Sequence, residues 1–261
     1  MMLIMLLTAG AAFLFGYFLN ILYITVFYHR GLTHGAVRLS PATRRWVVLT
    51  GNWVTGLDPK GWACMHRMHH VYSDTPQDPH SPMQLGIWGV LPGQLHSYKR
   101  TLSRLQAGNA KYLSMVSDLD FPVNWLNRNK LWVLPYFLHV LIGLAVGAVT
   151  HLPLVGLAYW MGIMSHPLQG WMVNALSHRF GYSNYELGDH SRNNWLVALL
   201  VFGEGYQNNH HHKPESANFS AKGWEFDMGY WLCLLAEQCG LLQIPRAPEP
   251  MRRQPREMRV F

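Results

Sequence analysis

The sequence predicts an all-α integral membrane protein with three to four transmembrane helices and a helical cap on the cytoplasmic side. Three observations support this fold class. Hydrophobic residues make up 49% of the 261 residues, and charged residues only 13%. Every Lys, Arg, Asp and Glu lies within residues 29–130 or 179–261. Most of the 15 histidines occur in clusters that begin where an apolar segment meets a charged one.

The first predicted crossing lies within residues 1–28, which carry no charged side chain. At about 1.5 Å per residue, a helix of about 26 residues is roughly 39 Å long and crosses a hydrocarbon core of about 30 Å with tilt. No Lys or Arg precedes the apolar run. We therefore expect a spanning helix rather than a signal peptide, which needs a basic start.

The second apolar segment, residues 131–178, is long enough for two crossings joined by a tight turn at His151 and Pro153. A soluble helical protein would have to place these 48 consecutive uncharged residues in its core. Residues 42–57 are apolar but too short to cross, so we expect them at the membrane surface.

The basic residues indicate the orientation. All 21 Lys and Arg lie on segments that share one side if the crossings are as described, and that side is the cytoplasm. The formal charge of +7 then faces anionic lipid headgroups and any acidic soluble partner. Residues 1–245 are predicted to form one domain, followed by a polar, basic tail over 246–261. The basic residues form no nucleic-acid-binding motif.

The first histidine motif, HRGLTH, contains His29 and His34 directly after the first apolar segment. Residues five apart on an ideal α-helix are about 140° apart in projection, so these two rings cannot face one ion unless the helix unwinds. Gly31 and Gly35 allow such unwinding.

The second motif, HRMHH, places His66, His69 and His70 at positions i, i+3 and i+4, which share one face of a helix. All three imidazoles are therefore expected to point the same way. In the third motif, NALSH, Asn174 and His178 form an i, i+4 pair at the cytoplasmic end of the predicted hairpin.

The fourth motif, GEGYQNNHH, adds His210 and His211. Imidazole suits iron, copper, nickel and zinc, and the three cysteines have no paired metal or redox spacing. A structural zinc normally takes four ligands. Eight histidines in four motifs are too many for one such ion, so the sequence predicts a site for two metal ions in the cap.

These four motifs, with WACMHRMHHVYSDTPQDPH around the second, closely resemble those of the membrane-bound acyl desaturases of the stearoyl-CoA delta-9 type. The resemblance runs from about residue 5 to about residue 245. It implies two iron ions, O2 as co-substrate, and insertion of a cis double bond into a saturated fatty acyl chain carried by coenzyme A or a lipid. Neither the carrier nor the position of the bond follows from it.

The resemblance also implies metal ligands. The matching histidines are His29, His34, His66, His69, His70, His178, His210 and His211. Asn174 matches a ligand that acts through a water molecule. Gln207 departs from the pattern, because animal members have a histidine there. Three alternatives are open: Gln207 coordinates a metal or holds a water, His212 replaces the missing histidine, or the centre is weakened.

Ligating imidazoles usually donate their other N–H to a carboxylate or a carbonyl. Asp74, Asp78, Asp189 and Glu204 are the acids nearest to the motifs, and solvated loop acids or helix caps are the alternative interpretation.

The resemblance further implies a narrow apolar tunnel for the acyl chain. Phe13 and Tyr17 lie where the tunnel is expected to end, and Trp62 and Trp171 lie near its expected bend. Aromatic residues near helix ends also serve as membrane anchors, which is the alternative for all four.

The sequence contains no His-Pro-Gly-Gly motif of a fused haem domain, so we expect electrons from a separate ferredoxin, rubredoxin or cytochrome b5 with its reductase. The QNNHH form resembles bacterial members and implies a multi-pass protein of the bacterial inner membrane. The family usually begins with a helical hairpin, of which only the second helix is present here. Two alternatives remain: a di-iron hydroxylase or ketolase of alkanes, sterols or carotenoids, and a non-catalytic membrane metal-binding protein.

Overall fold

A computed structural model describes residues 2–245, and residues 1 and 246–261, which include the predicted tail, lie outside the described residues. The elements, in chain order, are α1 (Met2–Ile21), η1 (Leu22–Thr33), β1 (Arg38–Leu39), α2 (Pro41–Thr55), α3 (Pro59–Tyr72), α4 (Pro82–Gln106), α5 (Ala110–Met115), α6 (Trp125–Arg128), α7 (Leu134–Val149), α8 (Pro153–Ile163), α9 (His166–Trp171), η2 (Met172–Leu176), α10 (Trp195–Leu200), α11 (Gln207–His212), α12 (Met228–Gln238) and β2 (Leu242–Gln243). The two short strands form one antiparallel pair. The predicted all-α class is confirmed.

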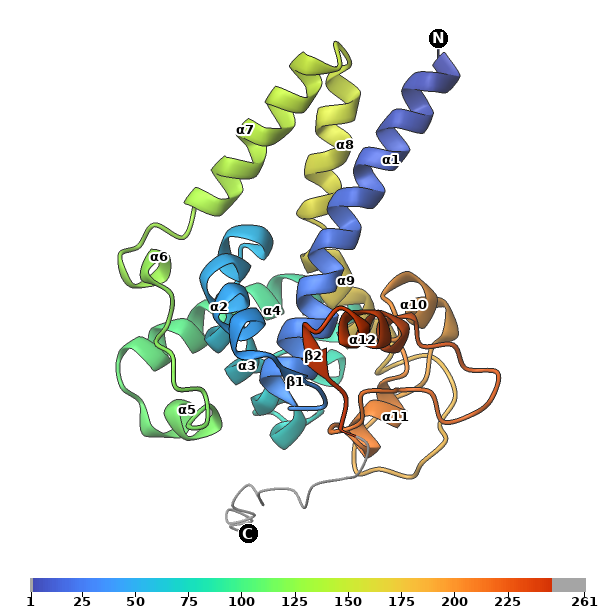
Figure 1. Cartoon of the computed structure of the whole chain (residues 1–261). Coiled ribbons are helices and arrows are strands. Elements are labelled where there is room, and N and C mark those ends of the chain that lie inside the picture. Colours follow the sequence, from blue (N-terminus) through green and yellow to red (C-terminus); the bar gives the residue numbers. More distant parts are fainter. Residues whose placement is uncertain (1, 246–261) are drawn as a thin grey trace.

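Three helices, α1, α7 and α8, project from a body that contains the other helices (Figure 1). The start of α1 and the α7–α8 turn lie at the same end, away from the body (Figure 1). Glycines allow the three helices to pack closely, since a Cβ at Gly162 of α8 would lie 2.1 Å from the carbonyl oxygen of Phe13 in α1. A Cβ at Gly156 would lie 2.0 Å from the carbonyl oxygen of Gly143 in α7. Such small residues are typical of helix contacts within membranes.

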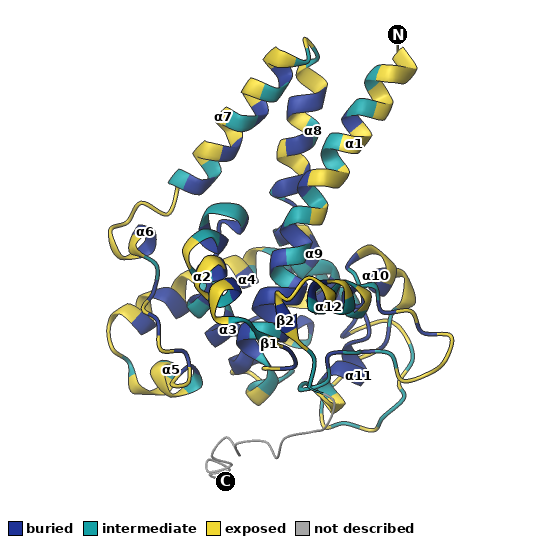
Figure 2. Cartoon of the chain, viewed as in Figure 1, coloured by how far each residue is buried: buried dark blue, intermediate teal, exposed yellow. Residues whose placement is uncertain are grey.

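Many residues of the projecting helices α1 and α7 are exposed (Figure 2), and these include large apolar ones. Leu3, Leu14, Phe137 and Leu144 are each more than half exposed. Among the described residues, one continuous helix, Met2–Thr33, is long and apolar enough to cross a membrane. The apolar helices Leu134–Val149 and Pro153–Ile163 are shorter. The number of crossings therefore stays a prediction.

The body is built around η1, which continues α1 into the main hydrophobic core. Tyr23, Val26 and Tyr28 of η1 are fully buried. Capping side chains start the neighbouring helices: Ser40 accepts a hydrogen bond from a backbone N–H in the first turn of α2, and Asp58 does the same for α3. In each case a proline follows the cap, where its missing N–H costs nothing. Helix α2 lies within two residues of the expected segment 42–57.

The close approach of α1 and α8 predicts that Gly162→Val destabilises the protein. The added side chain meets the backbone of α1, and overpacking of this kind costs about 1–3 kcal/mol. Thermal unfolding in detergent measures the effect. Gly10→Val is the matched control, because no atom lies within 4 Å of a Cβ at that position of α1. Equal unfolding temperatures for the two variants would contradict the packing assignment.

Candidate metal centre

Four segments of the body bring eight histidine side chains together. His29 lies on η1 and His34 ends it, α3 carries three more, His178 follows η2, and α11 carries the last two. Five of them form the five-imidazole cluster: His29, His34, His66, His70 and His210. The other three form the three-imidazole cluster: His69, His178 and His211. The sequence-predicted histidines thus converge, in two groups.

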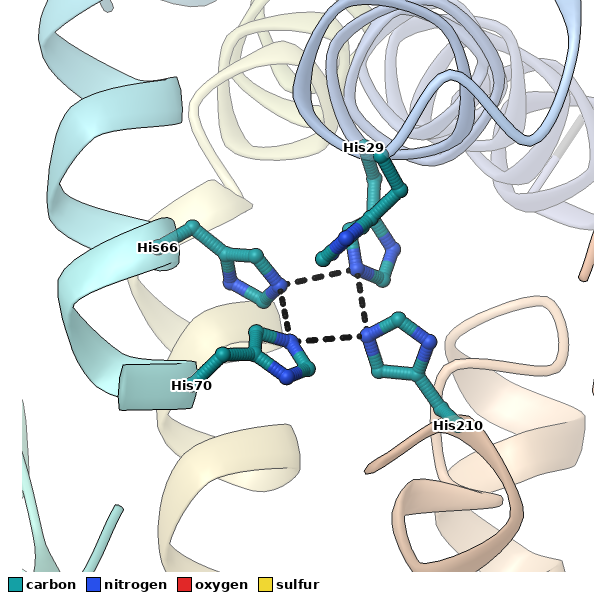
Figure 3. A group of neighbouring side chains, drawn as sticks. His29, His66, His70 and His210 are labelled. Atoms are coloured by element: carbon teal, nitrogen blue, oxygen red, sulfur yellow. Dashed lines mark hydrogen bonds between the residues drawn. The ribbon is translucent and has the colours of Figure 1, made fainter. Parts of the chain in front are cut away.

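Four Nε2 atoms of the five-imidazole cluster form a closed ring of contacts (Figure 3). The distances are 2.9 Å for His29–His66, 2.9 Å for His66–His70, 3.0 Å for His70–His210 and 3.0 Å for His210–His29. Each ring nitrogen carries either one hydrogen or one lone pair in the ring plane, so a single Nε2 cannot make full hydrogen bonds to both of its neighbours, and hydrogen bonds alone cannot account for all four contacts. In a regular square with these edges, the centre lies about 2.1 Å from each corner, which matches the distance from imidazole nitrogen to zinc in proteins. The arrangement fits a metal ion.

The fifth member, His34, reaches the cluster because the helix is locally unwound into a wider turn. The segment Leu22–Thr33 is a π-helix, in which residues five apart are joined by backbone hydrogen bonds. The backbone N–H of His34 donates to the carbonyl of His29 at 3.1 Å, which brings both rings to one side. The buried Nε2 of His34 has no partner. The expected departure from α-helical winding is present as this π-helix, which contains Gly31, and Gly35 follows it with a left-handed backbone conformation (φ 63°).

The three-imidazole cluster is nearly symmetric. Its ring centroids are 5.0 Å apart for His69–His178, 5.1 Å for His69–His211 and 5.0 Å for His178–His211. The Nε2 atoms of all three rings are buried and have no hydrogen-bond partner. Three lone pairs that meet in a space without a donor fit a second metal ion.

The expectation that the three imidazoles of α3 point the same way holds only in part. His66 and His70 belong to the five-imidazole cluster, whereas His69 belongs to the other. The clusters are neighbours, since the His70 and His211 ring centroids are 4.4 Å apart. One helix turn therefore contributes imidazoles to both clusters.

In the three-imidazole cluster, the Nδ1 of each ring donates a hydrogen bond to a different carboxylate. The Nδ1 distances are 3.0 Å from His69 to Asp78, 3.1 Å from His178 to Asp74 and 2.7 Å from His211 to Asp189. These contacts assign the proton to Nδ1 and leave the Nε2 lone pair for a metal.

Among the described residues, one carboxylate lies this close to the five-imidazole cluster: an oxygen of Glu204 is 2.6 Å from Nδ1 of His29. All four acids that the sequence nominated thus contact ligand candidates.

Burial keeps most of these imidazoles neutral. Loss of solvation, together with neighbouring positive charge, holds the pKa well below its ordinary value for His34, His66, His70 and His210. Burial also lowers the pKa of His69, but the carboxylate of Asp78 outweighs it, and the pKa is raised overall. Neutral imidazole is the form that binds metal ions, so these four rings of the five-imidazole cluster do not need to lose protons first.

The remaining ligand candidates lie at the edge of the clusters. Gln207 is buried, and its amide donates to the Glu204 carbonyl at 3.0 Å, but its Oε1 has no partner. Asn174 lies on η2 and donates to Gln94 at 3.4 Å. His212 is exposed and stacks on Tyr185 with ring centroids 3.7 Å apart, outside both clusters.

His80 is a residue that the sequence reasoning missed. Its ring is fully buried and stacks on His69 at 4.6 Å, and neither ring nitrogen has a hydrogen-bond partner. With His69 and Asp78 it forms a third group of possible metal ligands. Its place in the DPH run, two residues after the acid that contacts His69, was the available signal.

An apolar cavity borders the histidines. Its walls include Ile24, Trp62, Leu95, Tyr98, Val173 and Val201, and it also reaches His29, His66, Asn174 and Gln207. The Trp62 ring lies parallel to His66, with centroids 5.0 Å apart. A long apolar molecule that binds in this cavity therefore lies beside the five-imidazole cluster.

The other three residues expected at the tunnel do not line this cavity. Trp171 donates its indole N–H to the Ile87 carbonyl at 2.8 Å and stacks on Trp88. Phe13 stacks on Tyr17, whose hydroxyl donates to the Leu200 carbonyl at 2.5 Å.

Tyr17 nevertheless lies one layer behind the cavity. It packs against a buried cluster that contains two wall residues, Val173 and Val201. It can therefore influence the depth of the cavity without touching its contents.

Comparison with known proteins places these features in a family. The family model described as fatty acid desaturase matches residues 5–221. A hex-5-enoyl-[acyl-carrier protein] acetylenase of Moorena producens is 32% identical over 247 residues, which are 88% of this chain and 74% of the relative. An acyl-CoA 5-desaturase of Anemone leveillei is 32% identical over 232 residues, which are 86% of this chain and 67% of the relative. An sn-1 stearoyl-lipid 9-desaturase of Anabaena variabilis is 30% identical and covers 89% and 81%.

The carboxylate contacts predict that Asp189→Asn weakens metal binding at the three-imidazole cluster. The amide cannot accept the His211 proton as strongly, and loss of such a partner costs about 10–100-fold in affinity. Metal content after exposure to a graded chelator measures the effect. Glu186→Gln, an exposed acid three residues away, is the control. Metal retention equal to that of the control would show that the Asp189 contact has no such role.

Proposed function

The chain belongs to the fatty acid desaturase family, and we propose that its two histidine clusters bind two iron ions that use O2 to insert a cis double bond into a saturated acyl chain. The chain is thus an oxidoreductase that acts on fatty acyl chains. The observation that carries the proposal is the convergence of inward-facing imidazole nitrogens in two adjacent clusters beside one apolar cavity.

The donor set fits iron. The five-imidazole cluster would hold one ion and the three-imidazole cluster the other. Imidazole nitrogens without thiolate ligands suit non-haem iron, as they also suit copper, nickel and zinc. An unactivated methylene has no acidic proton and no leaving group, so iron and O2 would supply the oxidising power that side-chain acids and bases lack. The roles of the protein are binding, orientation and exclusion of water.

The cavity residues would orient the acyl chain. Trp62 forms a flat apolar wall against His66, and Ile24, Val173 and Val201 extend the apolar surface. A chain in this groove presents its methylenes at a fixed depth beside the histidines. Positional control of this kind determines which carbons react, since small displacements from the reactive geometry reduce rates strongly.

Gln207 is the best remaining candidate to complete the metal centre. Its Oε1 is buried and has no partner among the described residues, Gln207 and Asn174 both line the cavity, and either amide could hold a water on a metal. His212 is a poor substitute because its ring is exposed and stacked on Tyr185. Of the three alternatives, we therefore propose the one in which Gln207 acts as a ligand or holds a water.

We propose that α1, α7 and α8 cross the membrane and that the body lies on the cytoplasmic side of a bacterial inner membrane. The exposed apolar surfaces of these helices and the shared position of their far ends support this topology (Figures 1 and 2). The confinement of all Lys and Arg to the other segments supports the orientation.

The two electrons needed for each double bond would come from a separate ferredoxin, rubredoxin or cytochrome b5. The formal charge of +7 is carried by the segments that form the body and the tail, which favours an acidic carrier.

Expression in a desaturase-deficient host tests the proposed function. We expect new fatty acids that are lighter by two hydrogens, detected by mass spectrometry. Gln207→His should preserve the product, whereas Gln207→Ala should reduce both the product and the iron content. A product that gains oxygen would indicate a hydroxylase, and iron binding without any lipid product would indicate a metal-binding protein. Equal activity of Gln207→Ala and the wild type would exclude a role for Gln207.

Tyr17→Ala is expected to shift the products toward longer acyl chains. Removal of the ring leaves space behind Val173 and Val201, so the cavity wall can recede. The ratio of chain lengths among unsaturated fatty acids in cells measures the shift. Phe15→Ala removes a ring that is 63% exposed on the same helix and serves as the control. An acyl profile equal to that of the control would contradict this assignment.

A further inference from the structure

A buried group of charges lies behind the five-imidazole cluster. Arg30 directly follows His29 and is completely buried. Its guanidinium donates to Glu204 at 2.8 Å and to both oxygens of Asp227 at 3.0 and 2.9 Å. Its Nε donates to the carbonyl of Ala217 at 2.9 Å, and the guanidinium carbon lies 3.8 Å from the Phe219 ring centroid. A buried guanidinium with this many partners occupies one defined position.

Glu204 is shared between this arginine and the cluster. One carboxylate oxygen lies 2.6 Å from Nδ1 of His29, and the other accepts from Arg30 and from the hydroxyl of Thr25. His29 and Arg30 therefore share the negative charge of one carboxylate. Whatever draws Glu204 toward Arg30 weakens its hold on His29.

Asp227 is built into this arrangement from a distant part of the chain. It lies beyond residues 5–221, the part that the family model matches. Besides Arg30, it accepts from the backbone N–H groups of Phe219 at 2.7 Å and Tyr230 at 3.0 Å, and so caps α12. Gly203 leaves room for it, because a Cβ there would lie 1.9 Å from Asp227 Oδ1. The contacts leave one arginine facing two carboxylates.

We propose that Asp227 is a positioning residue for the metal site of the five-imidazole cluster, which it supports through Arg30 and Glu204. By pairing with one edge of the guanidinium, Asp227 limits the attraction between Arg30 and Glu204. The Glu204 carboxylate then keeps His29 oriented and basic, so that its Nε2 binds the metal firmly. The inference rests on the proposed function, since it requires metal ions at the histidine clusters.

The decisive variant is Asp227→Asn, which removes the charge and keeps the shape. Among residues 2–245, Arg30 is then left with Glu204 as its only counter-charge, and the support of His29 weakens. We expect Fe(II) to be lost selectively from the five-imidazole cluster, about 10–100-fold more readily than in the wild type. Iron content against a graded chelator and the loss of one of two Mössbauer components measure this. Asp120→Asn removes the partner of the surface residue Arg44 and is the control, with both irons retained.

A double-mutant cycle distinguishes a positioning role of Asp227 from an effect on overall stability. It does so even if Asp227→Asn alone folds poorly. If Asp227 acts through Glu204, adding Asp227→Asn to Glu204→Gln causes little further loss of iron from the five-imidazole cluster. Additive losses, or equal loss from both clusters, would show a purely structural role and overturn the proposal. Full retention of both irons in Asp227→Asn would overturn it as well. If the wild-type protein binds no pair of metals, the proposed function fails, and this inference fails with it.

Discussion

The structure depends on the burial of eight imidazole rings whose inner nitrogens face one another. Buried lone pairs that face one another repel each other, and the arrangement becomes favourable when cations occupy the two centres. The close contacts among four Nε2 atoms and the unpartnered Nε2 atoms of the other four rings express this requirement. The surrounding helices hold ligands that would otherwise separate.

Local departures from α-helical geometry deliver several of these ligands. The π-helix Leu22–Thr33 brings His29 and His34 to one side, and a second π-helix, Met172–Leu176, precedes His178. Widened turns of this kind occur frequently at functional sites. Because η1 continues α1 directly, a helix that contacts α8 outside the body also carries ligands inside it. Packing of the projecting helices and geometry of the metal site are thus connected through one continuous segment.

The two clusters differ in their electrostatic support. Three imidazoles have three carboxylate partners, whereas five imidazoles have one, and that one is shared with Arg30. Carboxylates make imidazoles more basic and stabilise the charge of a bound metal. The cluster with three imidazoles therefore has more carboxylates around it than the cluster with five. Their negative charge compensates for its smaller number of nitrogen donors. The network of Arg30, Glu204 and Asp227 adjusts the same property at the other cluster, from the side of the C-terminal helix α12.

The sequence alone determined the helical class, the apolar segments and the eight histidines that converge, because charge distribution and motif spacing are local properties. It also nominated the four acids that contact these rings. Tertiary structure decided what depends on contacts between distant segments: the division of α3 ligands between two clusters, the exposure of His212 and the burial of His80. It also decided that Trp171, Phe13 and Tyr17 lie outside the cavity and that Asp227 reaches Arg30. These outcomes depend on where helices cross, and no spacing along the chain encodes that.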